Sequence, residues 1–324
     1  MSVLLATLVV LADVESDIAE IRAAAASDWD AAAVVYNSLD VNYSDELTKQ
    51  IDGVDEEPYR RECSLSYRAD ESLALFASFS QSTGFGGRVV ANPEYFFDLY
   101  WQSPSFDPPN QALSALKAAE KRPLPAGGIP FVPRLGSAVI DCRSPLLIVN
   151  IPIRELVNGR EGYTPVSVDS LGDGRRRVTW RCDAPQVQRD VEGGLYIVDL
   201  DPALGWLGVR SERQTPDGIV VSTEASDFRE AAAWNEQLGG RKVFVPYSVK
   251  SVVSFPNGAG TETSQIKVEV ANPSTRPVEE FRLSFYGISE RVLDPPARRN
   301  PVWWLLAIVA LIGGLIAYLW RANG

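Results

Sequence analysis

The 324-residue chain contains no histidine. A Ser-His-Asp or Cys-His catalytic pair is therefore excluded, and so is a zinc site that uses histidine. General acid–base chemistry near neutral pH would fall to perturbed carboxylates, lysine, tyrosine or cysteine. The chain has 42 acidic residues, so pairs of them are expected anywhere and indicate no site by themselves. We predict no catalytic residue, no metal site and no cofactor.

Long runs of one charge sign are also absent, and the formal net charge is -11. A nucleic-acid-binding protein needs clustered lysine and arginine to neutralise phosphates. The densest basic patch, residues 175–177, leads into a predicted strand, where successive side chains alternate between the two faces. The charge distribution therefore argues against nucleic acid as a partner.

Cysteine is scarce, and its spacing does not resemble a set of metal ligands. The chain has Cys63, Cys142 and Cys182, with no C-x-x-C motif. Cys142 and Cys182 would be able to form a disulfide if the domain is extracytoplasmic. The alternative is three separate buried thiols.

One long hydrophobic run stands at the C-terminal end. Residues 301–320 read PVWWLLAIVALIGGLIAYLW and carry no charge, and about 20 apolar residues are what a helix needs to span a membrane. Trp303 and Trp304 stand at one rim, Tyr318 and Trp320 at the other, as membrane-interface anchors do. We predict a proline-rich tether (294–300), a single transmembrane helix (301–320) and a short tail (321–324).

The two ends of the chain predict different topologies. The N-terminal end predicts a signal peptide and thus an extracytoplasmic domain, whereas the charges around the C-terminal span predict a cytoplasmic domain. Residues 2–12 are apolar but too few to span a membrane, which suits a signal peptide over 1–12. Arg298 and Arg299 precede the span and only Arg321 follows it, which favours a tail-anchored protein with a cytoplasmic domain. A signal peptide would override so small a charge difference. We therefore favour an extracytoplasmic domain and keep the cytoplasmic one as the alternative.

Residues 14–39 show helical periodicity. Apolar side chains recur every three or four positions and give one apolar face, so the sequence predicts a long amphipathic helix. The residues of that face are Ile18, Ile21, Ala25, Trp29, Ala32 and Tyr36.

After the helix the period changes to that of strands. Residues 59–69 and 72–80 predict two strands, the second alternating through Leu73, Leu75, Ala77 and Phe79. Prolines interrupt residues 92–133, where we predict a short helix over 110–121.

In the remainder of the domain, residues 164–286, the sequence predicts a meander of short antiparallel strands. Turn signals such as Pro216-Asp217-Gly218 separate most of them, and short connections favour antiparallel neighbours. A helical or loop interruption is expected over 228–237. The predicted strands cover 164–169, 176–183, 194–199, 207–214, 219–225, 243–254, 265–272 and 281–286.

This order of elements resembles the LolA/LolB-like lipoprotein-carrier superfold, an unclosed β-barrel whose concave side is covered by helices. The resemblance is carried by the helix ending in Trp29, Tyr36 and Tyr43, by the ladder 194–206 with Val209-Arg210, and by the return strand 243–248. It implies an α+β domain over residues 13–293, with an antiparallel meander forming an unclosed barrel over an amphipathic helix. The carriers are free or lipid-anchored at an N-terminal cysteine, whereas this chain has a C-terminal apolar segment instead.

Three functions remain open. The first is a membrane-tethered domain that binds or senses a lipid or lipopeptide, and the second is a structural or interaction module of an envelope complex without a ligand pocket. The third is a carboxylate hydrolase using Asp199 and Asp201, although Asp201-Pro202 is also typical of a turn. For the first function, the candidates for lining the ligand groove are Trp29, Tyr36, Phe96, Phe97, Trp101, Trp180 and Trp206.

Overall fold

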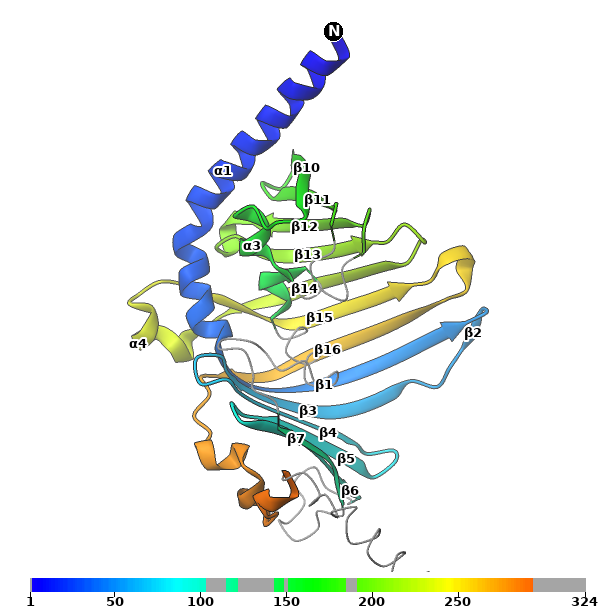
Figure 1. Ribbon diagram of the computed structural model, residues 1–324, viewed down its shortest axis with the longest axis vertical. Coiled ribbons are helices and arrows are strands. Elements are labelled where there is room, and N and C mark those ends of the chain that lie inside the picture. The colour runs from blue at the N-terminus through cyan, green and yellow to red at the C-terminus, as the bar shows by residue number, and fades with distance from the viewer. Residues whose placement is uncertain (1, 103–114, 122–142, 149–150, 185–190, 294–324) are drawn as a thin grey trace, which may run out of the picture.

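The computed structural model describes residues 2–102, 115–121, 143–148, 151–184 and 191–293. In these residues a large antiparallel sheet dominates the fold, and one long helix crosses it (Figure 1). The sheet combines two meanders, one from each half of the chain.

The first meander pairs its main strands in chain order, and its shortest strand, β2, pairs with β1. The strands predicted over 59–69 and 72–80 are confirmed as β3 and β4. The strands of this meander are Ser38–Ile51 (β1), Val54–Asp55 (β2), Tyr59–Arg68 (β3), Leu73–Ser80 (β4), Phe85–Ala91 (β5), Tyr95–Gln102 (β6) and Ala115–Lys121 (β7).

The second meander also pairs in chain order, so the antiparallel arrangement expected from its short connections is confirmed. Its strands are Tyr163–Ser170 (β10), Arg176–Cys182 (β11), Leu195–Asp201 (β12), Leu207–Gln214 (β13), Val220–Glu230 (β14), Phe244–Ser254 (β15) and Gly260–Asn272 (β16). The predicted interruption falls after β14, as the short helices Ala232–Trp234 (η3) and Asn235–Leu238 (α4).

A small subdomain lies between the meanders in sequence. It contains the single turn Ser144–Leu146 (η1), the two-residue strands Leu147–Ile148 (β8) and Ile151–Pro152 (β9), and the helix Ile153–Val157 (α3). β8 and β9 pair with each other apart from the main sheet.

The two meanders are joined by β1 and β16, whose register runs from Asp40 opposite Asn272 to Ile51 opposite Gly260. A bulge between Asn42 and Tyr43 interrupts the register and bends the pair. Within the described residues the strand order begins at β10 and ends at β7, and these edge strands do not pair with each other. The curved sheet in Figure 1 is therefore an unclosed barrel, as the sequence predicts.

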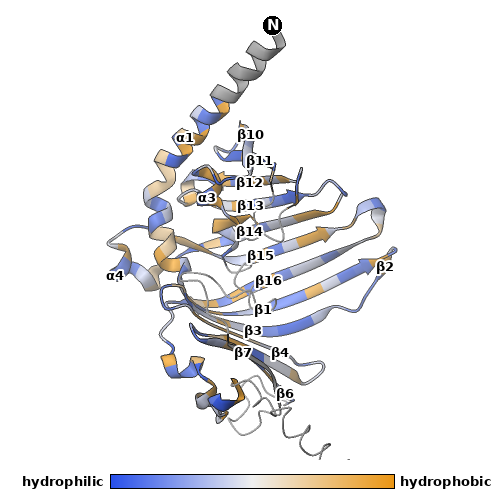
Figure 2. Ribbon diagram, in the orientation of Figure 1, coloured by the Kyte–Doolittle hydropathy of each residue, from blue (hydrophilic) through white to orange (hydrophobic). Residues whose placement is uncertain are grey.

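Helix α1 runs from Ser2 to Tyr36 and crosses the strands near one end, called here the helix end; the opposite end, with the β13–β14 and β15–β16 turns, is the hairpin end (Figure 1). The predicted amphipathic face is confirmed, because all six of its apolar residues are buried. Figure 2 shows hydrophobic and hydrophilic residues alternating along α1, and largely hydrophilic β1 and β3 towards the hairpin end. Residues 2–12, predicted as part of a signal peptide, form the first turns of the helix.

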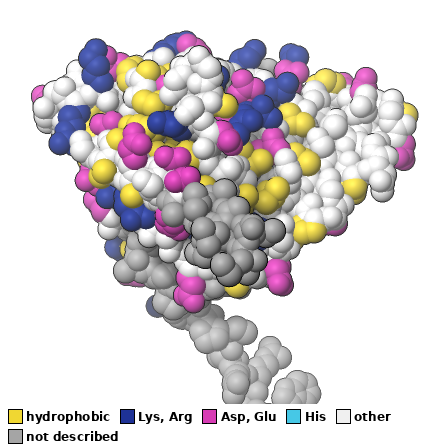
Figure 3. Space-filling model, turned by 90° about the horizontal axis from the view of Figure 1, so that it is seen from above, with side chains coloured by type: hydrophobic (Ala, Val, Ile, Leu, Met, Phe, Trp, Pro, Cys, Tyr) yellow, Lys and Arg dark blue, Asp and Glu magenta, His cyan; other side chains and the backbone are white. Residues whose placement is uncertain are grey.

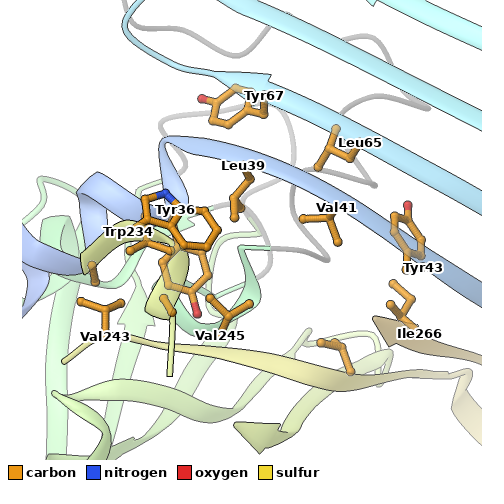
Figure 4. Packing of buried hydrophobic residues seen from close by; sticks show 14 of the residues in the cluster. Tyr36, Leu39, Val41, Tyr43, Leu65, Tyr67, Trp234, Val243, Val245 and Ile266 are labelled. Carbon is orange, nitrogen blue, oxygen red and sulfur yellow. The ribbon is translucent and has the colours of Figure 1, made fainter. Parts of the chain in front are cut away.

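Buried apolar side chains form three clusters. The central cluster joins the last turns of α1 to β1, β3 and β15, and includes Tyr36, Leu65 and Trp234 (Figure 4). The second cluster packs α1, from Val14 to Trp29, against α3 and β10–β12. The third cluster lies on the other face of β4–β6, under a C-terminal strap defined as residues 278–293.

The strap accounts for one wrong prediction. Residues 281–286 are predicted as a strand but form parts of two single turns, Val278–Phe281 (η5) and Leu283–Tyr286 (η6). These turns direct Phe281, Leu283 and Tyr286 into the third cluster. The segment packs its side chains on a face of the sheet there, so it meets no strand edge with which its backbone could pair. Both faces of β4 are consequently buried, which a simple alternating pattern does not anticipate.

The helix predicted over 110–121 is also wrong in its described part, because residues 115–121 form β7; residues 110–114 lie outside the described residues. β7 pairs with β6 along its length. The sequence ALKAAEK favours a helix by propensity, but an open strand edge supplies backbone partners that override it. A third difference is β1, a 14-residue strand for which the sequence predicts no element, since its outer half is almost wholly polar.

Candidate ligand-binding face

The concave face of the sheet carries a row of hydroxyl side chains across four neighbouring strands. The cross-strand register places Ser211 on β13 beside Thr223, then Ser251, then Ser264 on β16. These four residues, called here the hydroxyl row, are buried (Ser211) or half-buried (the others). Thr223 Oγ1 and Ser251 Oγ lie 3.1 Å apart, within hydrogen-bonding distance.

Two residues further towards the helix end, the same face becomes apolar. Ala225, Val249 and Ile266 occupy the next positions of β14, β15 and β16, and all three are buried in the central cluster. Figure 4 shows Val41 of β1 and Ile266 of β16 among the side chains on this side of the sheet. The concave face therefore changes from apolar at the helix end to hydroxylated towards the hairpin end.

The helical elements cover only the helix end of this face. Helix α1 packs against β10 and β1, and η1 packs against β13 and β14. In the described parts of the chain, no helix crosses the strands at the hairpin end (Figure 1). The right-hand part of the surface in Figure 3, on the side of the hairpin ends, is largely white, so uncharged polar side chains and backbone make up most of it.

The hydroxyl row ends at an ion pair between Asp45 of β1 and Arg61 of β3. Ser264 Oγ donates a hydrogen bond of 2.8 Å to Asp45 Oδ1, and Arg61 donates to Asp45 Oδ2. Asp45 is only 4% exposed. The buried carboxylate is thus satisfied from two neighbouring strands, which makes this corner of the face rigid and polar.

A cavity of about 700 Å³ lies beside this ion pair, at β1, β3 and β16. All but one of its lining residues are of polar or charged types. The residues that line it are Ser44, Asp45, Glu46, Pro58, Arg60, Arg61, Glu62, Gln81, Ser82, Gln265 and Lys267.

The convex face carries charges of alternating sign in one cross-strand row. Arg177, Asp199, Arg210, Glu224 and Lys250 are successive register partners from β11 to β15. Opposite charges in directly facing positions stabilise neighbouring strands. The part of the convex face over β11–β15 is therefore polar.

The two carboxylates proposed for a hydrolase both have structural partners. Asp199 accepts two hydrogen bonds from Arg177, at 2.7 and 2.8 Å. Asp201 Oδ1 accepts a hydrogen bond of 2.9 Å from the backbone N–H of Ala203, which confirms the turn at Asp201-Pro202.

The seven predicted groove residues are distributed over the three clusters and do not meet in one groove. Trp29, Trp180 and Trp206 belong to the second cluster, where Trp29 Nε1 donates a hydrogen bond of 3.0 Å to the backbone carbonyl of Trp206. Tyr36 and Phe96 belong to the central cluster. The remaining two residues, Phe97 and Trp101, lie in the third cluster on the convex side.

Several predicted residues lie wholly or partly outside the described part of the chain. Cys182 is buried in the second cluster, whereas Cys142 lies outside the described residues, so the Cys142–Cys182 disulfide stays a prediction. The tether, the span and the anchors Trp303, Trp304, Tyr318 and Trp320 also lie outside them. Among the residues that are described, no helix combines the length and the apolar character needed to cross a membrane.

Sequence reasoning misses the hydroxyl row. The signal in the sequence is only compositional, since several serines and threonines occur in the strands around 223, 251 and 264. That signal becomes a site only through the register, which brings residues from four strands side by side.

No protein-family model and no curated protein matches the sequence. Solved structures that resemble the fold include a LolA superfamily protein from Nitrosomonas europaea (10% identity, TM-score 0.42, 81% of this chain and 98% of that one). A domain assigned as an outer membrane lipoprotein-sorting protein from Vibrio parahaemolyticus has 9% identity and a TM-score of 0.44, over 83% and 97%. A DUF1329 family protein from Desulfovibrio piger has 9% identity and a TM-score of 0.44, over 82% and 98%. The LolA superfamily, which the order of elements resembles, is thus among the folds that these structures represent.

Proposed function

We propose that this chain binds an amphipathic ligand, a lipid or lipopeptide, on the concave face of its sheet. The observation that carries the proposal is that this face combines buried apolar residues at the helix end with the hydroxyl row, which lies two residues further towards the hairpin end. A ligand with an apolar chain and a polar part suits a face that carries both kinds of surface, because each part meets surface of its own kind.

The proposal includes the C-terminal apolar segment as a membrane tether and an extracytoplasmic position for the domain. Both rest on the sequence: the uncharged run 301–320 with its aromatic rims, and the apolar start of the chain. A tethered domain stays at the membrane surface and would take its ligand there, rather than carry it across a compartment.

Photo-crosslinking tests the ligand part. We expect a dodecanol analogue with a diazirine on its chain to label the full chain saturably, at residues of β13–β16 on the concave face. The S251W variant should abolish labelling by filling the face. S254W is the matched control, because Ser254 lies on the same strand but on the convex face. Labelling that is not saturable, or that both variants leave unchanged, would rule the proposal out.

A second function is favoured by a different observation. Trp101, Trp180, Tyr36 and Phe97 are almost completely buried, so the aromatic residues expected to line a groove serve packing instead. The ordered row of charges on the convex face would then be the surface that meets a partner in an envelope complex. Crosslinking in intact cells would then yield a partner in a fixed stoichiometric ratio to this chain. The R210E and K250E variants would each abolish crosslinking to that partner. In this case S251W would leave the complex intact.

A further inference from the structure

A half-buried guanidinium, for which the described residues supply no carboxylate partner, lies at the helix end of the concave face. Arg143 Nη2 donates a hydrogen bond of 3.0 Å to Asn37 Oδ1, and Nη1 lies 3.4 Å from the Tyr67 hydroxyl. The guanidinium stands over the Tyr67 ring, 5.4 Å from its centroid. Its Nε atom is buried and has no hydrogen-bond partner in the described chain.

The neighbouring residue repeats this pattern. Ser144 begins η1, its side chain is buried, and its Oγ has no hydrogen-bond partner among the described residues. Two consecutive residues thus each keep a buried polar atom with unused hydrogen-bonding capacity. Buried polar groups are normally satisfied, so such a pair needs an explanation.

Among the described residues, no acidic side chain compensates the charge of Arg143. Burial lowers the pKa of Arg143, and the opposing contributions come from Tyr67 and Tyr36 rather than from an acidic side chain. An arginine does not lose its proton in a protein, so it cannot escape the cost of burial by becoming neutral. An anion from outside the chain would supply the missing partner.

Arg61, on the same strand as Tyr67, shows the contrast. Arg61 is paired with Asp45 at the outer end of the concave face. Between the two arginines, the same face carries Leu65 of β3 with Leu39 and Val41 of β1, all buried in the central cluster. An apolar stretch therefore runs from Arg143, which has no acidic partner in the described residues, to Arg61, which Asp45 neutralises.

We propose that Arg143, together with Ser144 and Tyr67, binds the oxyanion head, a carboxylate or a phosphate, of an amphipathic ligand whose chain lies along the concave face. This inference rests on the proposed function and names the chemical class of its ligand. Arginine provides several N–H donors for an oxyanion, and hydrogen bonds to charged groups are the stronger ones.

The test is competition against the dodecanol photo-probe on the full chain. Dodecyl phosphate and dodecanoate should compete at concentrations about tenfold or more below that of dodecanol. In the R143M variant, dodecyl phosphate and dodecanoate should compete only at the concentration at which dodecanol does, and that concentration of dodecanol should be the same as for the wild type. The R143K variant should show an intermediate preference for the anionic competitors. Inorganic phosphate should not compete at the concentrations at which dodecyl phosphate does.

R160M is the matched control. Arg160 also lies over a tyrosine, with its guanidinium 5.8 Å from the Tyr163 ring centroid, but it is paired with Glu155. R160M should keep the wild-type preference for anions. The melting temperature of R143M without ligand should equal or exceed that of the wild type, because removal of an uncompensated buried charge does not destabilise.

The outcomes separate the two proposals. Saturable labelling with equal competition by anionic and neutral probes in the wild type would overturn the anion site and leave the proposed function standing. An anion preference that survives in R143M, or competition by inorganic phosphate as strong as by dodecyl phosphate, would overturn it as well. Absence of saturable labelling on the concave face would overturn the proposed function and this inference together.

Discussion

Arg61 donates hydrogen bonds from both Nε and Nη2 to one carboxylate oxygen of Asp45, at 2.8 and 2.6 Å. Asp45 lies on β1, Arg61 on β3, and Ser264 on β16 donates to the other oxygen of the same carboxylate. β1 and β16 join the two halves of the sheet, so this small network ties the two meanders together on the concave face.

Loss of the arginine should destabilise the fold. We expect R61M to lower the free energy of unfolding by about 2 kcal/mol, since Asp45 would stay buried without its cation. This figure is below that of a fully buried pair because the Arg61 side chain is 34% exposed. Urea unfolding followed by circular dichroism gives the measurement.

Arg60 is the control for this prediction. Its side chain is 75% exposed and pairs with Glu46, 39% exposed, on the convex face. R60M should change the free energy of unfolding by less than about 1 kcal/mol. If the two variants unfold at the same urea concentration, the buried network does not stabilise the join between the meanders.

Gly86 should tolerate no side chain, because Trp101 occupies the space above it. A Cβ atom at Gly86 would stand 2.2 Å from Trp101 Cε2, far inside contact distance. We expect G86A to cost about 2–3 kcal/mol, as overpacking of a core does. Thermal unfolding of the full chain, converted with the enthalpy of the transition, measures this loss.

A second substitution at this site tests whether the clash with Trp101 causes the stability loss of G86A. If the clash with Trp101 is responsible, W101L should cost less in the G86A background than alone, a coupling that a double-mutant cycle reveals. G172A is the control, since no heavy atom lies within 4 Å of a Cβ at Gly172. Strict additivity of G86A and W101L would show that the strain lies elsewhere.

The helix and most of the strands are predictable from the sequence because their hydrophobic patterns and turn signals are local. All six residues of the predicted face of α1 are buried, and the short connections of residues 163–272 required antiparallel neighbours. β1 was out of reach, since its outer half pairs with β16, more than two hundred residues away, and carries polar residues on both faces. Residues 281–286 show the converse: an apolar run docks on a sheet face instead of adding a strand.

The candidate site was less predictable than the fold. Sequence reasoning favoured aromatic residues, and the structure uses most of them to fill three separate clusters. The residues that give the concave face its chemistry are serines and threonines, which become a row only through strand register. Arg143 gave no sign in the sequence, because its lack of a carboxylate partner is a property of the packed structure.

Alkaline pH should loosen the strap through Tyr95 and Tyr286. Burial raises the pKa of both hydroxyls above the usual value of about 10, and Glu290 raises that of Tyr95 further. A raised pKa in the folded state means that folding favours the protonated hydroxyl. Its contribution to stability is thus fully present below pH about 10 and is lost as pH rises through the higher folded-state value.

Hydrogen exchange of residues 278–293 measures this effect. The Tyr95 hydroxyl donates to Glu290 and accepts from the backbone N–H of Leu283, at 2.9 and 3.2 Å, so its ionisation removes a donor that holds the strap. We expect strap protection to fall above pH about 10 before that of β1 and β16 does. Y95F should lose part of this protection already at neutral pH, with little further change on alkalisation. Simultaneous loss in strap and sheet would contradict a local release.

Removal of residues 301–324 should release the chain from membranes. The full chain should stay in the pellet when vesicles are washed with alkaline carbonate, because 20 uncharged residues bounded by aromatic rims are held by the bilayer core rather than by surface charge. The truncated chain should appear in the supernatant. A variant with I308K and L311K tests whether apolar character is the cause, since charges at mid-membrane are costly; it should behave like the truncation, whereas I308L and L311I together should not. Extraction of the unaltered chain by carbonate without detergent would refute the tether, and the concave face would then meet its ligand away from the bilayer.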